Sequence, residues 1–152
     1  MKFKFTYLLL ALIAVAFISG CLGGGAKNNP TPVIPDGSYT GEFRILHVHA
    51  ANNIDTNKTN IVVNIAPVSS STYTVTGDTS TLHAGSKGTY TFYPGYSTVV
   101  FVDKTYSSTA PVTKSHLTGS YTYYFDGTKF QMTAHSALDT LVLQYDLVKS
   151  GN

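Results

Sequence analysis

The chain has 152 residues, of which 43% are hydrophobic and only 12% charged, with one cysteine and no tryptophan. A chain of this length fits a single domain, and its one cysteine excludes an internal disulfide framework and a cysteine-based zinc site. The formal net charge of +2 depends on Lys2 and Lys4; without them, eight basic residues balance eight acidic ones. A neutral chain lacks the positive surface that nucleic acid requires.

Residues 1–20 have the pattern of a signal peptide. Lys2 and Lys4 form a short basic region, and residues 7–18 are twelve apolar residues, the length of a signal-peptide core. A helix that crosses a bilayer needs about 20 such residues. The tetrapeptide Ile18-Ser19-Gly20-Cys21 follows directly. It resembles the lipobox of prokaryotic lipoproteins, and the run Gly23-Gly24-Gly25 resembles the spacer of archaeal surface lipoproteins.

The lipobox resemblance implies a lipid-anchored protein on the outer side of the cell membrane. Residues 1–20 would be removed, the thiol of Cys21 would carry a diacylglycerol, and its freed amine could take a further acyl chain such as palmitate. Two or more acyl chains anchor a protein stably, whereas one does not. Two other readings stay open: an uncleaved anchor, since residues 5–26 carry no charge, and simple secretion with Cys21 present by chance.

Residues 21–35 are predicted to be a tether between the lipid and the domain. Glycines, asparagines and three prolines, at positions 30, 32 and 35, oppose both helix and sheet. A linker of this length has a reach of about 20 Å. The domain should therefore lie close to its membrane.

Residues 36–149 are predicted to form one all-β domain, followed by a short tail at 150–152. Short runs of β-branched and aromatic residues alternate with polar ones and are separated by turn signals. Seven to nine strands are expected, and the polar segment 51–60 is expected to be a loop. The clearest runs are residues 39–45, 61–65, 72–76, 90–93, 97–102, 117–125, 128–134 and 140–148.

Two turns are specified by their residues. Pro94-Gly95 has the signature of a type II turn. Asp126-Gly127 predicts a two-residue hairpin loop in which both residues have positive φ. With such short connections, consecutive strands should be neighbours, which gives an antiparallel meander.

An antiparallel meander must cover its edges and its apolar face. An up-and-down barrel does both, and a two-sheet β-sandwich is the alternative. The strand entries Gly37-Ser38-Tyr39 and Gly119-Ser120-Tyr121, with the final Tyr145-Asp146-Leu147, resemble those of calycin-type, lipocalin-like lipoprotein barrels. The barrel is therefore favoured.

His47-Val48-His49 is a candidate metal site. Residues i and i+2 of a strand share a face and lie about 6.6 Å apart, so both imidazoles could hold one metal ion. A metal site needs a third protein ligand. Alternation places His116 and His135 on the outer face, and His83 lies in a segment without clear alternation. The competing interpretation is a strand end that emerges into solvent.

The same alternation predicts side chains that line a ligand site inside the barrel. Gly41, Gly119 and Ala134 share the inward positions, where small residues either leave a cavity or ease tight curvature of the sheet. The predicted lining residues are Tyr39, Phe43, Ile45, Tyr121 and Phe130.

Other chemistry is sparse in this sequence. No serine lies in a Gly-x-Ser-x-Gly motif, and the acidic residues are spread singly, so neither an enzyme nor a cofactor is expected. The many tyrosines could form a stacking surface, but tyrosine is also a good strand former. Asn57-Lys58-Thr59 is an N-glycosylation sequon, expected in the exposed polar loop.

Two functions remain open. The first is a lipid-tethered module that binds a small apolar or amphipathic ligand. The second is a structural or adhesive surface module that contacts proteins or glycans without a small ligand. Small inward residues favour the first only slightly.

Overall fold

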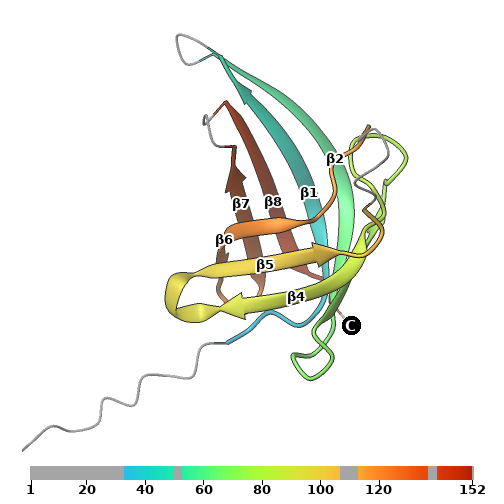
Figure 1. Cartoon of the computed structure of the whole chain (residues 1–152), viewed down its shortest axis with the longest axis vertical. Helices are drawn as coiled ribbons and strands as arrows, with labels where there is room; N and C mark the ends of the chain where they lie inside the picture. The colour runs from blue at the N-terminus through green and yellow to red at the C-terminus, as the bar shows by residue number, and fades with distance from the viewer. Residues whose placement is uncertain (1–32, 50–52, 107–112, 137–139, 152) are drawn as a thin grey trace, which may run out of the picture. The chain divides into compact units, whose positions relative to one another are not determined.

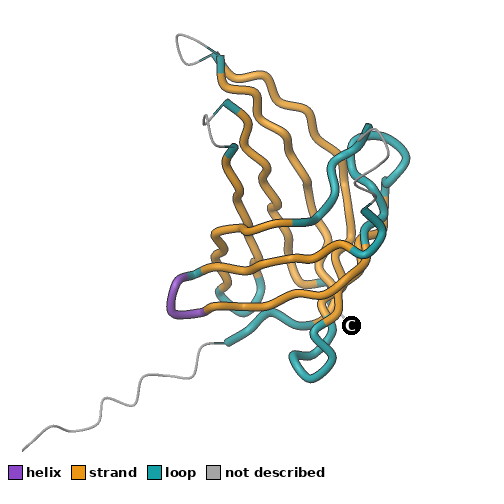
Figure 2. Tube along the Cα trace, in the orientation of Figure 1, coloured by secondary structure: helices purple, strands orange, loops and turns teal. Residues whose placement is uncertain are grey.

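The computed structural model describes residues 33–49, 53–106, 113–136 and 140–151. Eight antiparallel strands pair in chain order, and β8 pairs with β1 to close a barrel (Figures 1 and 2). The prediction of an all-β, up-and-down barrel is therefore confirmed, and the sandwich alternative is wrong. The strands are β1 (Gly37–Val48), β2 (Ile54–Ile65), β3 (Thr72–Gly77), β4 (Lys87–Tyr93), β5 (Thr98–Asp103), β6 (Gly119–Phe125), β7 (Lys129–His135) and β8 (Leu141–Lys149).

The alternating strand directions give the barrel two different ends. The segment 33–36 and the β2–β3, β4–β5 and β6–β7 turns lie at one end, which we call the closed end. The other four connections lie at the open end. β1 and β2 have 12 residues each, whereas β3 to β7 have six or seven. One wall of the barrel therefore extends beyond the opposite wall at the open end (Figure 1).

Strand alternation determines which side chains fill the barrel. In β1, Tyr39 and Phe43 are fully buried while Thr40 is exposed, and in β7, Phe130 and Met132 are buried while Gln131 is exposed. Apolar area removed from water contributes roughly 25 cal/mol per Å². The buried core consists of Tyr39, Phe43, Ile61, Val63, Ile65, Tyr73, Val75, Tyr90, Val99, Phe101, Leu117, Tyr121, Phe130, Met132, Tyr145 and Leu147.

Two inward glycines permit neighbouring strands to approach closely. A Cβ at Gly41 of β1 would lie 2.0 Å from the carbonyl oxygen of Asp146 in β8, and one at Gly88 of β4 would lie 1.9 Å from that of Val102 in β5. No side chain fits at such distances. The sequence left two roles open for inward small residues: leaving a cavity, or easing tight curvature of the sheet. Gly41 has the second role, because it lets β1 and β8 approach closely.

The expectation of a polar loop over residues 51–60 is wrong from Ile54 onward, because β2 begins at that residue. Residues 54–60 pair along their length with residues 42–48 of β1. On the outer face, Lys58 donates to Glu42 at 2.9 Å, and Arg44 bonds both Glu42 and Asp146. The pairs Lys58–Glu42 and Arg44–Asp146 join neighbouring strands, and such cross-strand pairs of opposite charge stabilise a sheet.

Both predicted turns differ from expectation in backbone geometry. Pro94–Tyr96 form one turn of 3-10 helix, and the residue with positive φ is Ser97, at 48°, rather than Gly95. In the β6–β7 turn Gly127 has φ of 97°, but Asp126 does not have positive φ. The carboxylate of Asp126 instead accepts the backbone N–H groups of Thr128 at 2.9 Å and Lys129 at 2.7 Å, as aspartate does in turns.

Candidate functional site

The five predicted lining residues all face the barrel interior, but four of them are core. Tyr39, Phe43, Tyr121 and Phe130 are at most 1% exposed, and only Ile45, near the open end, is half-buried. Tyr39 packs on Phe130 with ring centroids 5.4 Å apart, and Phe43 packs on Tyr145 at 4.8 Å. In the part of the chain that the structure describes, these rings occupy the interior up to the level of Phe43.

His83 covers Phe43 from the open end. It lies in the β3–β4 connection, is fully buried, and stands edge-on to the Phe43 ring at 4.8 Å. Its Nδ1 lies 2.5 Å from the carbonyl oxygen of Ala84, and its Nε2 lies 2.9 Å from the hydroxyl of Tyr145. Because a carbonyl oxygen only accepts, Nδ1 carries the proton and Nε2 accepts from Tyr145. Burial lowers the pKa of His83 to about 4, so the ring is neutral near pH 7.

Tyr121 differs from the neighbouring buried tyrosines. Tyr145 is bonded to His83, and the Tyr73 hydroxyl donates to the carbonyl of Leu117. The Tyr121 hydroxyl is buried and makes no hydrogen bond of normal geometry among the residues described, although the Tyr145 hydroxyl and the Thr118 backbone lie near enough to lower its pKa. Burial raises the pKa of Tyr121 to about 12. An unpaired buried hydroxyl is unfavourable by about 1–3 kcal/mol, so this group does not serve to stabilise the core.

Beyond His83, the tall strands leave an inward surface that the core does not fill. Ile45 and Leu143 are opposite each other across β1 and β8, and His47 is opposite both Asp55 and Leu141. Ile45, Leu141 and Leu143 are apolar and half-buried. The polar side chains of His47, Asp55 and Asn57 are exposed. We call this surface the open-end face; it consists of Ile45, His47, Asp55, Asn57, Ala134, Leu141 and Leu143.

The candidate metal ligands lie at the rim of the open-end face. His47 is the penultimate residue of β1, and His49 follows the strand. The Nε2 of His49 lies 2.9 Å from a carboxylate oxygen of Asp55, and both side chains are more than half exposed. No group of three histidine, cysteine or acidic side chains suited to a metal ion occurs in the described ranges. The arrangement is an exposed hydrogen-bonded pair at a hairpin end, and metal binding by His47 and His49 stays a prediction.

His116 does not lie on the outer face as alternation predicted, because β6 begins only at Gly119. Its Nδ1 is 2.7 Å from Asp103, whose side chain is fully buried, and its ring contacts Tyr106 at 5.2 Å. Asp103 also accepts two hydrogen bonds from Thr105. Burial alone would raise the pKa of Asp103, but the bonds from Thr105 and His116 hold it below the ordinary value.

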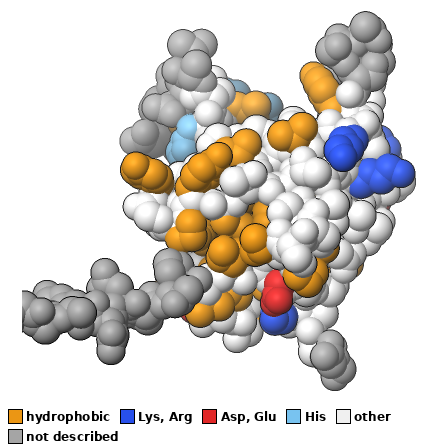
Figure 3. Space-filling model, turned by 60° about the horizontal axis from the view of Figure 1, so that its bottom comes forward, with side chains coloured by type: hydrophobic (Ala, Val, Ile, Leu, Met, Phe, Trp, Pro, Cys, Tyr) orange, Lys and Arg blue, Asp and Glu red, His pale blue; other side chains and the backbone are white. Residues whose placement is uncertain are grey.

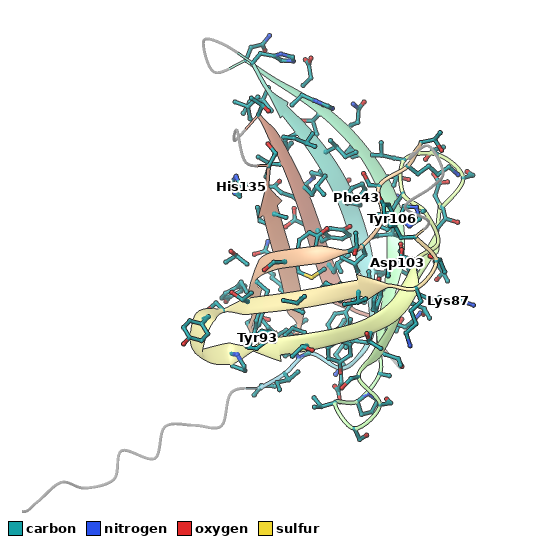
Figure 4. The ribbon with its side chains drawn as sticks, viewed as in Figure 1. Phe43, Lys87, Tyr93, Asp103, Tyr106 and His135 are labelled. Carbon is teal, nitrogen blue, oxygen red and sulfur yellow. The ribbon has the colours of Figure 1, made fainter. Side chains whose placement is uncertain are left out.

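Asp103 and His116 thus connect the end of β5 to the segment before β6. Both carboxylate oxygens of Asp103 are engaged inside the protein, which suits a structural pair. The prediction for His135 fits the structure, since this residue is exposed and projects outward from β7 (Figure 4).

The sequon asparagine, Asn57, is exposed but lies within β2 rather than in a loop. The hydroxyl of Thr59 donates to the carboxylate of Asp78 at 2.9 Å. Asn57 and Thr59 line a shallow pocket with the segment that follows β3. Glycosylation at Asn57 stays a prediction, now with a strand as its setting.

The tyrosines do not form one stacking surface. Tyr123 and Tyr124 point to opposite faces, as alternation requires: Tyr123 is half-buried against Phe92, whereas Tyr124 is 55% exposed. Tyr39, Tyr73, Tyr90, Tyr121 and Tyr145 are core residues. Most of the tyrosines therefore act as large core and strand residues.

Cys21, residues 1–20 and the tether up to residue 32 lie outside the described residues. Within the described ranges, no helix has the length and apolar character needed to cross a membrane. No protein-family model matches the chain, and no curated protein or solved structure is significantly similar to it. The lipobox and the lipocalin-like strand entries therefore stay predictions from sequence.

Sequence reasoning missed the two residues that organise the open end, His83 and Asp103. His83 forms an isolated β-bridge with Ser115, which lies in the β5–β6 connection. Both residues therefore lie in irregular segments. The available signal was indirect: a histidine between apolar Leu82 and Ala84 in a chain with few charges. Asp103 was counted only among the singly spread acidic residues, and its partner His116 is 13 residues away.

Proposed function

We propose that this protein is a lipid-anchored binding module of the cell surface, which holds a small amphipathic ligand on the open-end face. The observation that carries the proposal is the height difference between the two walls of the barrel. β1 and β2 extend beyond the level at which Phe43 and His83 fill the interior. Inward-facing apolar side chains therefore remain above the core with only partial cover.

The chemistry of this face suggests the class of ligand. Ile45, Leu141 and Leu143 offer apolar contact from β1 and β8, while Asp55 and Asn57 offer polar groups from β2. Binding sites for small molecules are mostly apolar, with a few polar groups that fix orientation. A ligand with an apolar body and a polar end would match both sides.

The ligand would not enter the lower barrel. Eight-stranded barrels are just wide enough for side chains to fill or for one small ligand, and here aromatic rings occupy the interior below His83. Catalysis is not proposed, because the carboxylate of Asp103 is engaged by Thr105 and His116.

The first test compares native and denaturing masses of the protein extracted from its own membrane in mild detergent. The mass under denaturing conditions should equal that of a chain that begins at Cys21 and carries two or three acyl chains. Additional mass under native conditions alone would reveal the ligand and its class. No additional mass would argue against a bound ligand.

The second test uses the chain from Cys21 to Asn152 and the amphipathic dye 1-anilinonaphthalene-8-sulfonate as the probe. Leu141→Asn places a polar amide on the apolar side of the open-end face, and we expect several-fold weaker dye binding. Val102→Asn is the matched control, because Val102 is 56% exposed on the outer face of β5. Equal dye binding by the two variants would refute the assignment of the face.

The anchor has its own test. Cys21→Ala should move the protein from the membrane to the soluble fraction, since the acylated thiol is lost. A Cys21→Ala protein that stays membrane-bound with residues 1–20 attached would support the uncleaved anchor instead.

One observation favours the alternative of a structural or adhesive module. A barrel with 16 core residues packed in its interior needs no ligand for stability. If the native and denaturing masses agree and the dye does not discriminate the variants, contact with surface proteins or glycans becomes the better interpretation.

A further inference from the structure

The closed end of the barrel carries apolar side chains that the core does not cover. Val33, Val68 and Tyr96 are 70%, 53% and 83% exposed. Beside them, the half-buried rings of Phe92, Tyr123 and Phe125 close the interior. Figure 3, in which this end comes forward, shows hydrophobic side chains gathered at its centre and few charged ones. We call these six residues the apolar end face.

The members of the apolar end face come from separate segments that meet at the closed end of the barrel. Phe92 packs against Tyr123 at 5.0 Å, and Phe125 packs against Tyr39 at 6.1 Å. Val68 and Phe92 line one pocket together with Ile34. The described charges at this end balance, with Asp36 and Asp126 against Lys129 and Lys149, and Lys149 lies 3.3 Å from Asp36. The surface is therefore apolar and aromatic without a net charge that would select a charged partner.

The point at which the chain enters the barrel, just before β1, indicates what covers the apolar end face. The described chain begins at Val33, which belongs to the face and lies only 12 positions after Cys21. Twelve residues span at most about 40 Å even when fully extended. A lipid on Cys21 would therefore keep the closed end within that distance of the bilayer surface. Tyrosines favour the membrane–water interface, where the ring is apolar and the hydroxyl is hydrated.

From these observations we propose that the apolar end face rests on the lipid surface, with Tyr96 and Val68 inserted at the level of the headgroups. The inference rests on the proposed lipid anchor, which brings the face to the membrane. A contact of a few side chains would be weak for the free domain, but the tether makes it intramolecular. The open-end face would then point away from the membrane.

The test uses the absence of native tryptophan and the single cysteine. The chain from Cys21 to Asn152 is coupled through the Cys21 thiol to a maleimide lipid in phosphatidylcholine vesicles, with bromine atoms placed near the headgroup end of the acyl chains. Tyr96→Trp places a fluorophore on the apolar end face. Ile54→Trp places the matched control at the opposite end, where Ile54 is 52% exposed.

We expect blue-shifted, bromine-quenched emission from Tyr96→Trp and unchanged emission from Ile54→Trp, consistent with burial about 5–10 Å into the interface. Adding Val68→Asp to Tyr96→Trp should remove the quenching, whereas adding Val102→Asp should not. Circular dichroism confirms that each variant is folded. Replacing part of the phosphatidylcholine with phosphatidylglycerol should leave the quenching unchanged, because the end carries no net charge.

Three results would overturn the proposal. Tyr96→Trp emission that is as unquenched as that of Ile54→Trp would show that the face does not touch lipid. Equal quenching of both would show contact without preference for an end. A blue shift that grows with protein concentration before coupling would assign the face to a second copy of the chain. Because coupling is chemical, these results are independent of the Cys21→Ala experiment, which tests the anchor itself.

Discussion

Acidification should destabilise this protein through His83 well before its carboxylates titrate. The ring is fully buried and neutral, and its pKa of about 4 lies below the ordinary value of 6.5. In the unfolded chain the same ring takes up a proton below pH 6.5. The stability that the neutral ring contributes is therefore complete above pH 6.5 and is lost as the pH falls from 6.5 towards 4.

The size of the effect follows from the two pKa values. Each pKa unit corresponds to 1.36 kcal/mol, so the free energy of unfolding should fall by about 2.5 kcal/mol between pH 7.5 and pH 4.5. Four of the described carboxylates have a lowered pKa. Asp78, Asp103 and Asp126, with an ordinary value of 3.8, contribute mainly below this window, whereas Glu42, with an ordinary value of 4.5, begins to contribute at its lower edge. Urea unfolding of the chain from Cys21 to Asn152 at one-unit pH intervals measures the slope.

Two variants separate His83 from the other histidines. His83→Gln cannot gain a proton but can still accept from the Tyr145 hydroxyl, so its free energy of unfolding should be nearly flat between pH 6.5 and 4.5. His47→Gln removes an exposed histidine near the end of β1 and should keep the wild-type slope. If wild type and His83→Gln lose stability in parallel, or if His83 itself titrates near 6.5 by NMR, the buried neutral ring is refuted.

Three further predictions, made with five substitutions, test the packing by urea unfolding. Tyr121→Phe removes an unpaired buried hydroxyl and should be neutral or stabilising by up to about 1 kcal/mol. Tyr145→Phe breaks the hydrogen bond to His83 and should lower the free energy of unfolding by about 1–2 kcal/mol. Equal losses in the two variants would contradict the hydrogen-bond assignment. Gly41→Ala forces β8 away from β1 and should lower the free energy of unfolding by at least about 2 kcal/mol. Gly95→Ala is the control, because Gly95 has open space around it, and it should change the free energy of unfolding by no more than about 0.5 kcal/mol. A tolerated Gly41→Ala would refute the close approach of β1 and β8. Asp103→Ala removes two hydrogen bonds to Thr105 and the pair with His116. The free energy of unfolding should fall by about 2 kcal/mol. An unchanged urea midpoint would show that the Asp103–His116 pair does not hold the open end together.

The fold was predictable because each strand carries its own evidence. Alternation in runs such as 39–45 and 140–148 identifies the strands and their inward faces, and short turns make consecutive strands neighbours. The upper half of β2 was missed for a physical reason. Asp55 and Asn57 point inward above the level of the core, where they meet water, so the apolar alternation that identifies a strand is absent there.

The candidate site was less predictable, because its organising contacts join segments that are far apart in sequence. Alternation correctly placed Phe43 and Ile45 inward, but it did not indicate that one would be covered and the other left half-buried. That difference is made by His83, from an irregular segment, which bonds Tyr145, 62 residues later in the chain. No local pattern encodes such a contact.

The strand count connects the two proposed surfaces. A closed meander with an even number of strands has both chain ends at the same end of the barrel, and here Gly37 and Lys149 both lie at the closed end. A lipid on Cys21 would therefore bring that end to the membrane and direct the opposite end outward. The two tall strands, β1 and β2, extend only in the outward direction. With an anchor on Cys21, the wall that bears the open-end face would face the medium from which a ligand must arrive, while the uncovered aromatic rings would face lipid.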